Sequence, residues 1–298
     1  MNSNYAIELS DVTMNYGKHM ALDHMNLQLE PNKIYGLLGR NGAGKTTMLN
    51  ILASKVFQTS GKAKVFGSAS YENINILKKI CLIEEKGFYS SHITVARALK
   101  LASGLYPNWD KKYADELLRL FELNPKKRFK QLSRGMESSL GLIIGLASRA
   151  PLTIFDEPSL GLDAVIRERF YDAVIEDFQK YPRTIIISTH LIDEVSRLFE
   201  NVIIVDRGKI LLQSDTMELK EKAYYISGKE DAVKACAEGT IILDEERFGS
   251  TFIYSVYSRN GLKCQNDVEI QSIPLQKLFV YFINPKIHDL LEKGGVLQ

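Results

Sequence analysis

The stretch GRNGAGKT, residues 39–46, constrains this chain more than any other part of its sequence. It fits the pattern G-x-x-x-x-G-K-[ST] without a gap, follows the apolar run IYGLL and precedes KTTMLNILAS, in which the apolar residues have helical spacing. A glycine-rich turn between a buried strand and a helix directs several backbone N–H groups inward, toward the partially positive N-terminus of the helix. We therefore expect a phosphate-binding loop, in which Lys45 reaches the β- and γ-phosphates and Thr46 supplies a hydroxyl to Mg²⁺.

A second segment, LTIFDEP (residues 152–158), reads as a buried strand that ends in two carboxylates. Near a phosphate loop, Asp156 is placed to bind Mg²⁺, directly or through water. Glu157 can polarise a water molecule for attack on the γ-phosphate. Two solvated acids at the end of a strand are the alternative interpretation, and the phosphate loop upstream favours the site.

Strands alternate with helices along most of the chain, which is typical of an α/β domain with a mostly parallel sheet. TIIISTH is another buried-type strand, and the segment between it and LTIFDEP has the pattern of an amphipathic helix. Residues from about 88 to 150 are helix-rich and look like an insertion. The character changes near Gln213, beyond which short strand-like and helical segments predict a small α+β appendage. The predicted domains are residues 1–213 and 214–298.

The composition argues against several classes of partner. Lys and Arg number 38 against 36 Asp and Glu, a net charge of +2 that offers no broad basic footprint for nucleic acid.

The three cysteines, Cys81, Cys236 and Cys264, form no C-x-x-C pair, so we expect them to be reduced. We find no signal peptide and no apolar run of roughly 18 residues, so a role at a membrane needs a separate spanning protein.

With LSRGM, residues 132–136, the motifs together resemble the ATP-binding subunits of ABC transporters, over about residues 5–214. Five motifs occur in the family's order, and LSRGM is similar to its signature LSGGQ. Ser133 and Gly135 are kept, whereas Arg134 and Met136 depart from the pattern. The resemblance implies that Ser133 and Gly135 contact the γ-phosphate of ATP held by the other subunit of a head-to-tail dimer. An ordinary helix cap at Ser133 is the alternative.

Three more positions take roles from the same resemblance. Asp163, in SLGLD, would align the two active sites across the dimer, although it can also be the N-cap of the next helix. His190, after the strand TIIIS, would contact the γ-phosphate and orient Glu157 and the attacking water. Tyr16 would stack on adenine. Contacts with ATP are thus implied for Tyr16, Gly39, Asn41, Gly42, Ala43, Gly44, Lys45, Thr46 and Thr47, with Lys45, Glu157 and His190 as the catalytic residues.

The stretch ICLIEEKGF departs from the family's pattern. The family has a glutamine there that touches Mg²⁺ and the attacking water, and the position falls on Glu85 when it is counted from the following helix. A carboxylate can still ligate Mg²⁺, but when ionised it cannot donate a hydrogen bond. We expect Glu85 to be a metal ligand, with Thr46 and Asp156, and to retune hydrolysis. The alternative is that Glu84 and Glu85 both face solvent.

The resemblance implies an ATPase that powers transport, with ATP and Mg²⁺ as cofactors. Its expected partners are an integral membrane subunit and a second ATPase subunit, identical or paralogous, at the cytoplasmic face of the membrane. A soluble ABC-type ATPase acting in DNA repair or on ribosomes is less favoured, because the chain lacks a long coiled coil and has one such domain. A regulatory nucleotide sensor with weak hydrolysis also stays open. A compact single ATPase domain with a C-terminal appendage resembles the ATPases of bacterial exporters. These export drugs and antimicrobial or cytolytic peptides, including phenol-soluble modulins.

Overall fold

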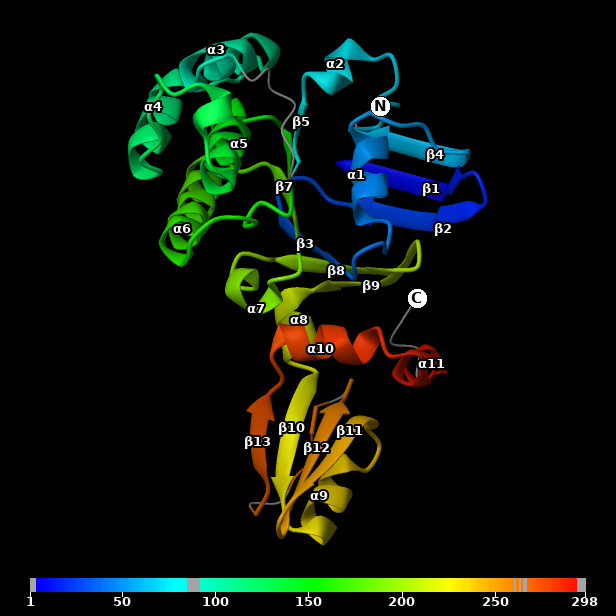
Figure 1. Ribbon diagram of the computed structural model, residues 1–298. Helices are drawn as coiled ribbons and strands as arrows, with labels where there is room; N and C mark the ends of the chain where they lie inside the picture. The colour runs from blue at the N-terminus through cyan, green and yellow to red at the C-terminus, as the bar shows by residue number, and fades with distance from the viewer. Residues whose placement is uncertain (1–3, 85–91, 260, 263, 265–266, 294–298) are drawn as a thin grey trace. The chain divides into compact units, whose positions relative to one another are not determined.

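Figure 1 shows the computed structural model, which describes residues 4–84, 92–259, 261–262, 264 and 267–293. The chain divides into two compact units: Met1–His190 with Val205–Ile210, and Leu191–Ile204 with Leu211–Gln298. We call them the ATPase unit and the C-terminal unit. Within the described residues, no helix has both the length and the apolar character to cross a membrane.

The ATPase unit begins with a three-stranded antiparallel sheet in the order β2-β1-β4. Toward its end, β2 alternates between buried and exposed residues, as a strand does when one face is packed and the other is solvated. The bounds are β1 Ile7–Tyr16, β2 His19–Leu29 and β4 Ser60–Val65.

The central sheet has the strand order β5-β6-β7-β3-β8-β9, and β5, β6, β7 and β3 are parallel neighbours. Every residue of β3, β6 and β7 is buried, which is why these strands read as continuous apolar runs. The carboxyl ends of parallel strands meet at one edge, so the residues that follow β3, β6 and β7 are brought together there. The bounds are β3 Ile34–Gly39, β5 Ile80–Ile83, β6 Leu152–Asp156, β7 Thr184–Thr189, β8 Asn201–Asp206 and β9 Lys209–Asp215.

The longest helices of the ATPase unit start at side-chain caps: Thr94, Asp110, Ser133 and Asp163 each accept a hydrogen bond from the first turn that follows. Helix α5 lies directly on β5 and β6, and a Cβ atom on Gly145 would come within 2.4 Å of the Phe155 ring. The bounds are α1 Lys45–Leu52, α2 Ile74–Leu77, α3 Val95–Leu105, α4 Lys111–Leu120, α5 Arg134–Ser148 and α6 Ala164–Lys180, with a 3-10 turn at Phe129–Gln131.

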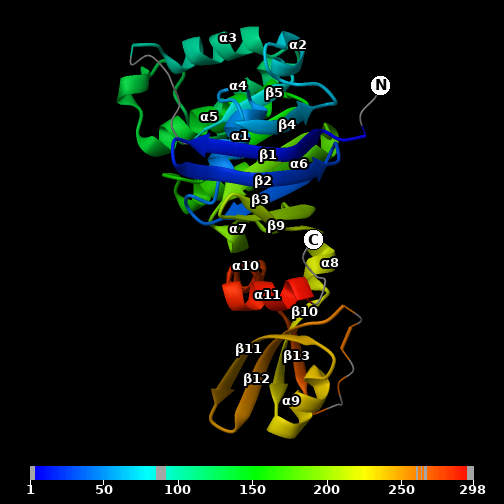
Figure 2. The ribbon, with the colours of Figure 1, turned by 90° about the vertical axis from the view of Figure 1, so that its right-hand side faces the viewer.

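The C-terminal unit contains an antiparallel sheet in the order β11-β12-β10-β13, with α9 against one face (Figures 1 and 2). This is a split βαβ arrangement, in which the first strand lies between the third and the fourth. Its core joins Ile226, Tyr254 and Val256 of the sheet to Val233 and Cys236 of α9. The bounds are α7 Ile192–Val195, α8 Thr216–Lys220, β10 Ala223–Gly228, α9 Glu230–Ala237, β11 Ile241–Phe248, β12 Thr251–Tyr257, β13 Glu269–Ser272, α10 Leu275–Phe282 and α11 Pro285–Lys293.

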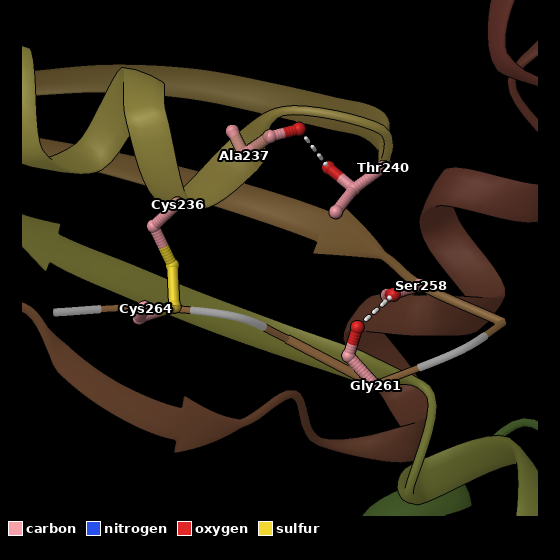
Figure 3. Close-up of a disulfide and its surroundings, with 6 residues drawn as sticks. All are labelled: Cys236, Ala237, Thr240, Ser258, Gly261 and Cys264. Atoms are coloured by element: carbon pink, nitrogen blue, oxygen red, sulfur yellow. Dashed lines mark hydrogen bonds between the residues drawn. A yellow bond between two sulfur atoms is a disulfide. The ribbon is translucent and has the colours of Figure 1, made fainter.

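The expectation that all cysteines are reduced is wrong for two of them. Cys236 and Cys264 form a disulfide, with Cα atoms 4.6 Å apart (Figure 3). They are 28 residues apart in the sequence, and they meet because α9 and Cys264 pack against the same apolar cluster. Spacing along the chain carries no signal of this meeting. Cys81 is a free, buried thiol, and burial raises its pKa.

Candidate nucleotide site

The phosphate loop, residues 39–46, joins β3 to α1 and depends on its glycines. Gly44 is the N-cap of α1 with a φ of 105°, a conformation that favours glycine. A Cβ atom there would also lie 2.6 Å from the backbone oxygen of Ala21. Gly42 has a φ of 81°, again in the left-handed region. The sequence pattern and the backbone therefore agree that this loop can curl around an anion.

Lys45 begins α1 and is only 6% exposed. Its Nζ atom donates hydrogen bonds to the carbonyl oxygens of Gly39 at 2.6 Å and Arg40 at 3.3 Å. Burial lowers the pKa of Lys45, whereas the carboxylates of Glu157 and Asp156 act to raise it. The ammonium group is thus held inside the curled loop, facing two acids at the end of β6.

Asp156 ties three elements together at the edge of the sheet. One carboxylate oxygen, Oδ2, accepts a hydrogen bond from the Thr46 hydroxyl at 2.8 Å, and Oδ1 accepts one from the Ser188 hydroxyl. Ser188 is a functional neighbour that the sequence interpretation did not include. It sits two residues before His190 and is the registered partner of Asp156 on β7, so strand alignment could have identified it.

Glu157 follows Asp156 in the left-handed conformation, with a φ of 51°. Its backbone N–H donates to the carbonyl oxygen of Ser188 at 3.1 Å and to its hydroxyl at 3.0 Å. Its Oε2 atom lies 2.7 Å from Nδ1 of His190. The side chain of Glu157 is 15% exposed and that of His190 is 49% exposed, so the pair reaches from the buried carboxylate toward solvent. The structure brings Lys45, Thr46, Asp156, Glu157 and His190 together.

The residues predicted to face a second subunit are helix caps within this chain. Ser133 Oγ accepts a hydrogen bond from the Met136 N–H at 3.3 Å, and Asp163 Oδ1 accepts one from the Ile166 N–H at 2.9 Å. The cap interpretations therefore hold. Both residues are also exposed, so their roles toward a partner are compatible with capping and stay predictions.

The sequence interpretation also involves Tyr16, Glu84 and Glu85, of which the structure describes the first two. Tyr16 ends β1 with its side chain about half exposed, and its stacking role stays a prediction. Glu84, after β5, forms an ion pair with Lys55. Glu85 lies outside the described residues, so its role as a metal ligand stays a prediction. Among the described residues, no three His, Cys, Asp or Glu side chains gather as a metal cluster.

The fold and this geometry define a P-loop ATPase, and comparisons with known proteins give its family. The ABC transporter family model matches residues 22–160. The bacitracin transport ATP-binding protein BcrA of Bacillus licheniformis is 31% identical over 280 residues, 92% of this chain and 89% of its own length. The ABC transporter ATP-binding protein YtrB of Bacillus subtilis is 28% identical over 216 residues, 72% of this chain and 74% of its own.

Solved structures show the same fold. An ATP-binding subunit of an ABC transporter superposes with a TM-score of 0.66 at 22% identity, over 72% of this chain and 92% of that one. The cassette MJ0796, in a dimeric post-hydrolysis state bound to ADP and Pi, gives 0.63 at 23% identity, over 70% and 98%. This chain belongs to the ATP-binding proteins of ABC transporters. It binds and hydrolyses ATP as a transporter subunit, so the predicted family, fold class and activity are confirmed.

Proposed function

We propose that this chain powers export of an antimicrobial or cytolytic peptide, or of a drug, through a separate integral membrane subunit at the cytoplasmic face of the membrane. The supporting observation is the match to BcrA, which covers 92% of this chain and so includes most of the C-terminal unit. The lantibiotic transport ATP-binding protein SrtF of Streptococcus pyogenes is 30% identical over 70% of this chain. These names belong to the relatives, and the shared chemistry they suggest is an amphipathic peptide.

Within the site, Lys45 binds the β- and γ-phosphates, and the Thr46 hydroxyl and the Asp156 carboxylate hold Mg²⁺. Their oxygens are hard donors that already lie 2.8 Å apart, which fits the ligands that Mg²⁺ prefers. Mg²⁺ would neutralise charge that develops on the phosphate oxygens. From the sequence alone, Glu85 is proposed as a third ligand of Mg²⁺.

Glu157 is the proposed general base. Its Oε2 accepts a proton from the water that attacks the γ-phosphate, and His190, 2.7 Å away, orients that carboxylate. Lys45 contributes by placing positive charge in a buried, low-dielectric site. The arrangement supplies positioning and electrostatic stabilisation, which are what phosphoryl transfer requires.

A complete site needs a second ATPase subunit, either a second copy or a paralogue. Ser133 and Gly135 of one subunit contact the γ-phosphate bound by the other, and Asp163 aligns the two sites. In this proposal residues 1–213 form the ATPase domain and 214–298 form an accessory domain. The exposed N-terminus of α5 offers backbone N–H groups and partial positive charge to the partner's nucleotide.

The catalytic proposal is tested with Glu157→Gln, because the amide cannot accept the proton. We expect turnover to fall by about 100-fold or more, while ATP binding persists and an ATP-dependent dimer accumulates in size-exclusion chromatography. The matched control is Asp11→Asn, since Asp11 also has a positive φ, of 54°, and also pairs with a histidine, His24, at 2.7 Å. Turnover that survives in Glu157→Gln would reject the base.

Export is tested by producing the chain with its co-purifying membrane protein in a peptide-sensitive bacterium. We expect resistance to cationic or amphipathic peptides to rise and to be lost with Glu157→Gln. If ATP binds with micromolar affinity but steady-state hydrolysis stays at background even with the membrane partner, the nucleotide-sensor alternative replaces the transport proposal.

A further inference from the structure

We propose that Ser138, on helix α5, is a positioning residue that holds the turn after β6 and thereby fixes Glu157 for hydrolysis. The proposal rests on the base role of Glu157 and deepens it. Ser138 lies outside the phosphate loop, the two acids and the signature residues Ser133 and Gly135, and it touches neither nucleotide nor water in our mechanism.

A short chain of hydrogen bonds connects Ser138 with Glu157. The Ser138 hydroxyl donates to the carbonyl oxygen of Leu160 at 2.8 Å, and the Leu160 N–H donates to the carbonyl oxygen of Glu157 at 3.3 Å. Leu160 therefore receives a bond from α5 at one end and closes the turn onto Glu157 at the other. Since the contact with Ser138 is partly buried, water competes poorly for the Leu160 oxygen.

Glu157 needs this support because its backbone is in the left-handed region, with a φ of 51°. Such a conformation is unfavourable for a residue with a long side chain and persists only where the surroundings hold it. On its N-terminal side, the Glu157 N–H is held by the carbonyl oxygen and hydroxyl of Ser188. On its C-terminal side, the support comes from Leu160 and, through it, from Ser138.

The first turn of α5 also packs directly against this turn. A Cβ atom on Gly135 would lie 2.6 Å from the Gly161 oxygen, and one on Gly161 would lie 3.1 Å from Cβ of Arg134. The two backbones are therefore closer than a side chain at position 135 would permit. Ser138 sits one helical turn further along the same face, so its hydroxyl supplies the directional bond to a contact that the glycines make close.

Helix α5 links the proposed contact with the partner's ATP to the proposed general base of its own subunit. Helix α5 starts at Ser133, which is proposed to meet the partner's ATP, and Ser138 connects the same helix to Glu157. A shift of α5 on formation of the dimer would move the Leu160 carbonyl and thus the base. Ser138 is in this way suited to couple occupancy of one site to hydrolysis at the other.

The test compares Ser138→Ala with Ser139→Ala in the full-length chain. Ser139 is the neighbouring hydroxyl on the same helix, but it donates to the oxygen of Gly135 within α5 at 2.9 Å and does not reach the turn. We expect Ser138→Ala to lower kcat by about three- to tenfold, with KM for ATP changed less than about twofold. Ser139→Ala should keep the kcat of the wild type, and each variant should lower Tm by no more than about 4 °C.

Two further variants separate positioning from general damage. Ser138→Thr keeps the hydroxyl and should recover at least half of the kcat, and Ser138→Cys, a weak donor, should fall between serine and alanine. The proposal is overturned if Ser138→Ala keeps the kcat of the wild type, or if Ser138→Thr is as slow as Ser138→Ala. The role of Glu157 fails by a different result, namely turnover in Glu157→Gln, so the two outcomes are distinguishable.

Discussion

The two units of this chain bury their polar groups in different ways. In the ATPase unit, fully buried parallel strands end at one edge, where Asp156 accepts a hydrogen bond from Ser188 and the charge of Lys45 lies nearby. In the C-terminal unit, an antiparallel sheet keeps charges at its surface and a disulfide links α9 to the segment at Cys264. The first arrangement forms a binding site for an anion, whereas the second forms a small unit that is cross-linked by a disulfide.

The ion pairs of the two units also differ in how far they are buried. The ATPase unit has a buried network in which Arg183 and Arg149 both contact Asp177, at 2.7 and 3.4 Å, and Arg149 also stacks on Tyr181. In the C-terminal unit, pairs such as Lys234–Glu230 are solvent-exposed and lie one helical turn apart. Removing a partner should therefore matter far more in the first unit than in the second.

The largest difference between the units should be in catalysis. Lys45→Ala removes the buried ammonium group from the phosphate loop, and we expect kcat to fall by about 100-fold or more, because such charges act in a low-dielectric site. Lys234→Ala, in the C-terminal unit, should leave hydrolysis unchanged. Steady-state phosphate release measures both. Equal losses in the two variants would contradict a division of labour between the units.

The next largest effect should be on the stability of the ATPase unit. Asp177→Ala removes the carboxylate that buried Arg183 shares with Arg149, which keeps its ion pair with Asp110, and we expect the free energy of unfolding to fall by about 3 kcal/mol. Glu230→Ala, which breaks an exposed pair in the C-terminal unit, should give no measurable change. Urea unfolding of the ATPase unit is followed by Trp109, the chain's one tryptophan, and that of the C-terminal unit by hydrogen exchange of α9.

Much of the ATPase site was predictable because its motifs follow parallel strands. A strand that ends in DEP and one that ends in STH must deliver Asp156, Glu157 and His190 to the edge where the phosphate loop begins, once the sheet is parallel. Beyond the rule that the carboxyl ends of parallel strands meet at one edge, this prediction needed no knowledge of which residues pair. The helix caps at Ser133 and Asp163 were also readable, since capping depends on local sequence.

The rest depended on tertiary contacts without a local signature. Ser138 looks like any helical serine until the Leu160 carbonyl is placed beside it. Cys236 and Cys264 are 28 residues apart in the sequence, and they meet because α9 and Cys264 pack against the same apolar cluster. A serine or a cysteine has the same sequence pattern whether its partner is water or a residue far along the chain, so pattern alone cannot choose.

The disulfide provides a sharper test of the C-terminal unit. Cys264→Ser opens a link across a sequence separation of 28 residues, and we expect the free energy of unfolding of this unit to fall by roughly 3.5 kcal/mol. Hydrogen exchange of β10 and β12 measures it. Reductant should lower the wild type to the level of the variant and leave the variant unchanged. Identical protection with and without reductant would show that the link contributes nothing, and ATP hydrolysis should be unaffected in every case.

The smallest expected effect concerns Tyr281, whose hydroxyl lies 2.9 Å from that of Ser255 and donates to Asp244 at 3.2 Å. Burial, with the charge of Asp244, raises the pKa of Tyr281 to about 12 from an ordinary value of 10.0. The neutral phenol therefore stabilises the folded state fully below pH 10, and this contribution is lost as pH rises through about 12.

Tyr281→Phe should cost the C-terminal unit below about 1 kcal/mol at neutral pH, because one hydrogen-bonded hydroxyl is removed without a large cavity. Above pH 10 the difference between the variant and the wild type should shrink, since the unfolded tyrosine then ionises and the phenylalanine does not. Urea unfolding curves at pH 8 and pH 11, followed by far-UV circular dichroism, provide the comparison. A gap that widens with pH would mean that the folded state favours the phenolate, and it would contradict the assignment of Asp244 as the neighbour that raises the pKa of Tyr281.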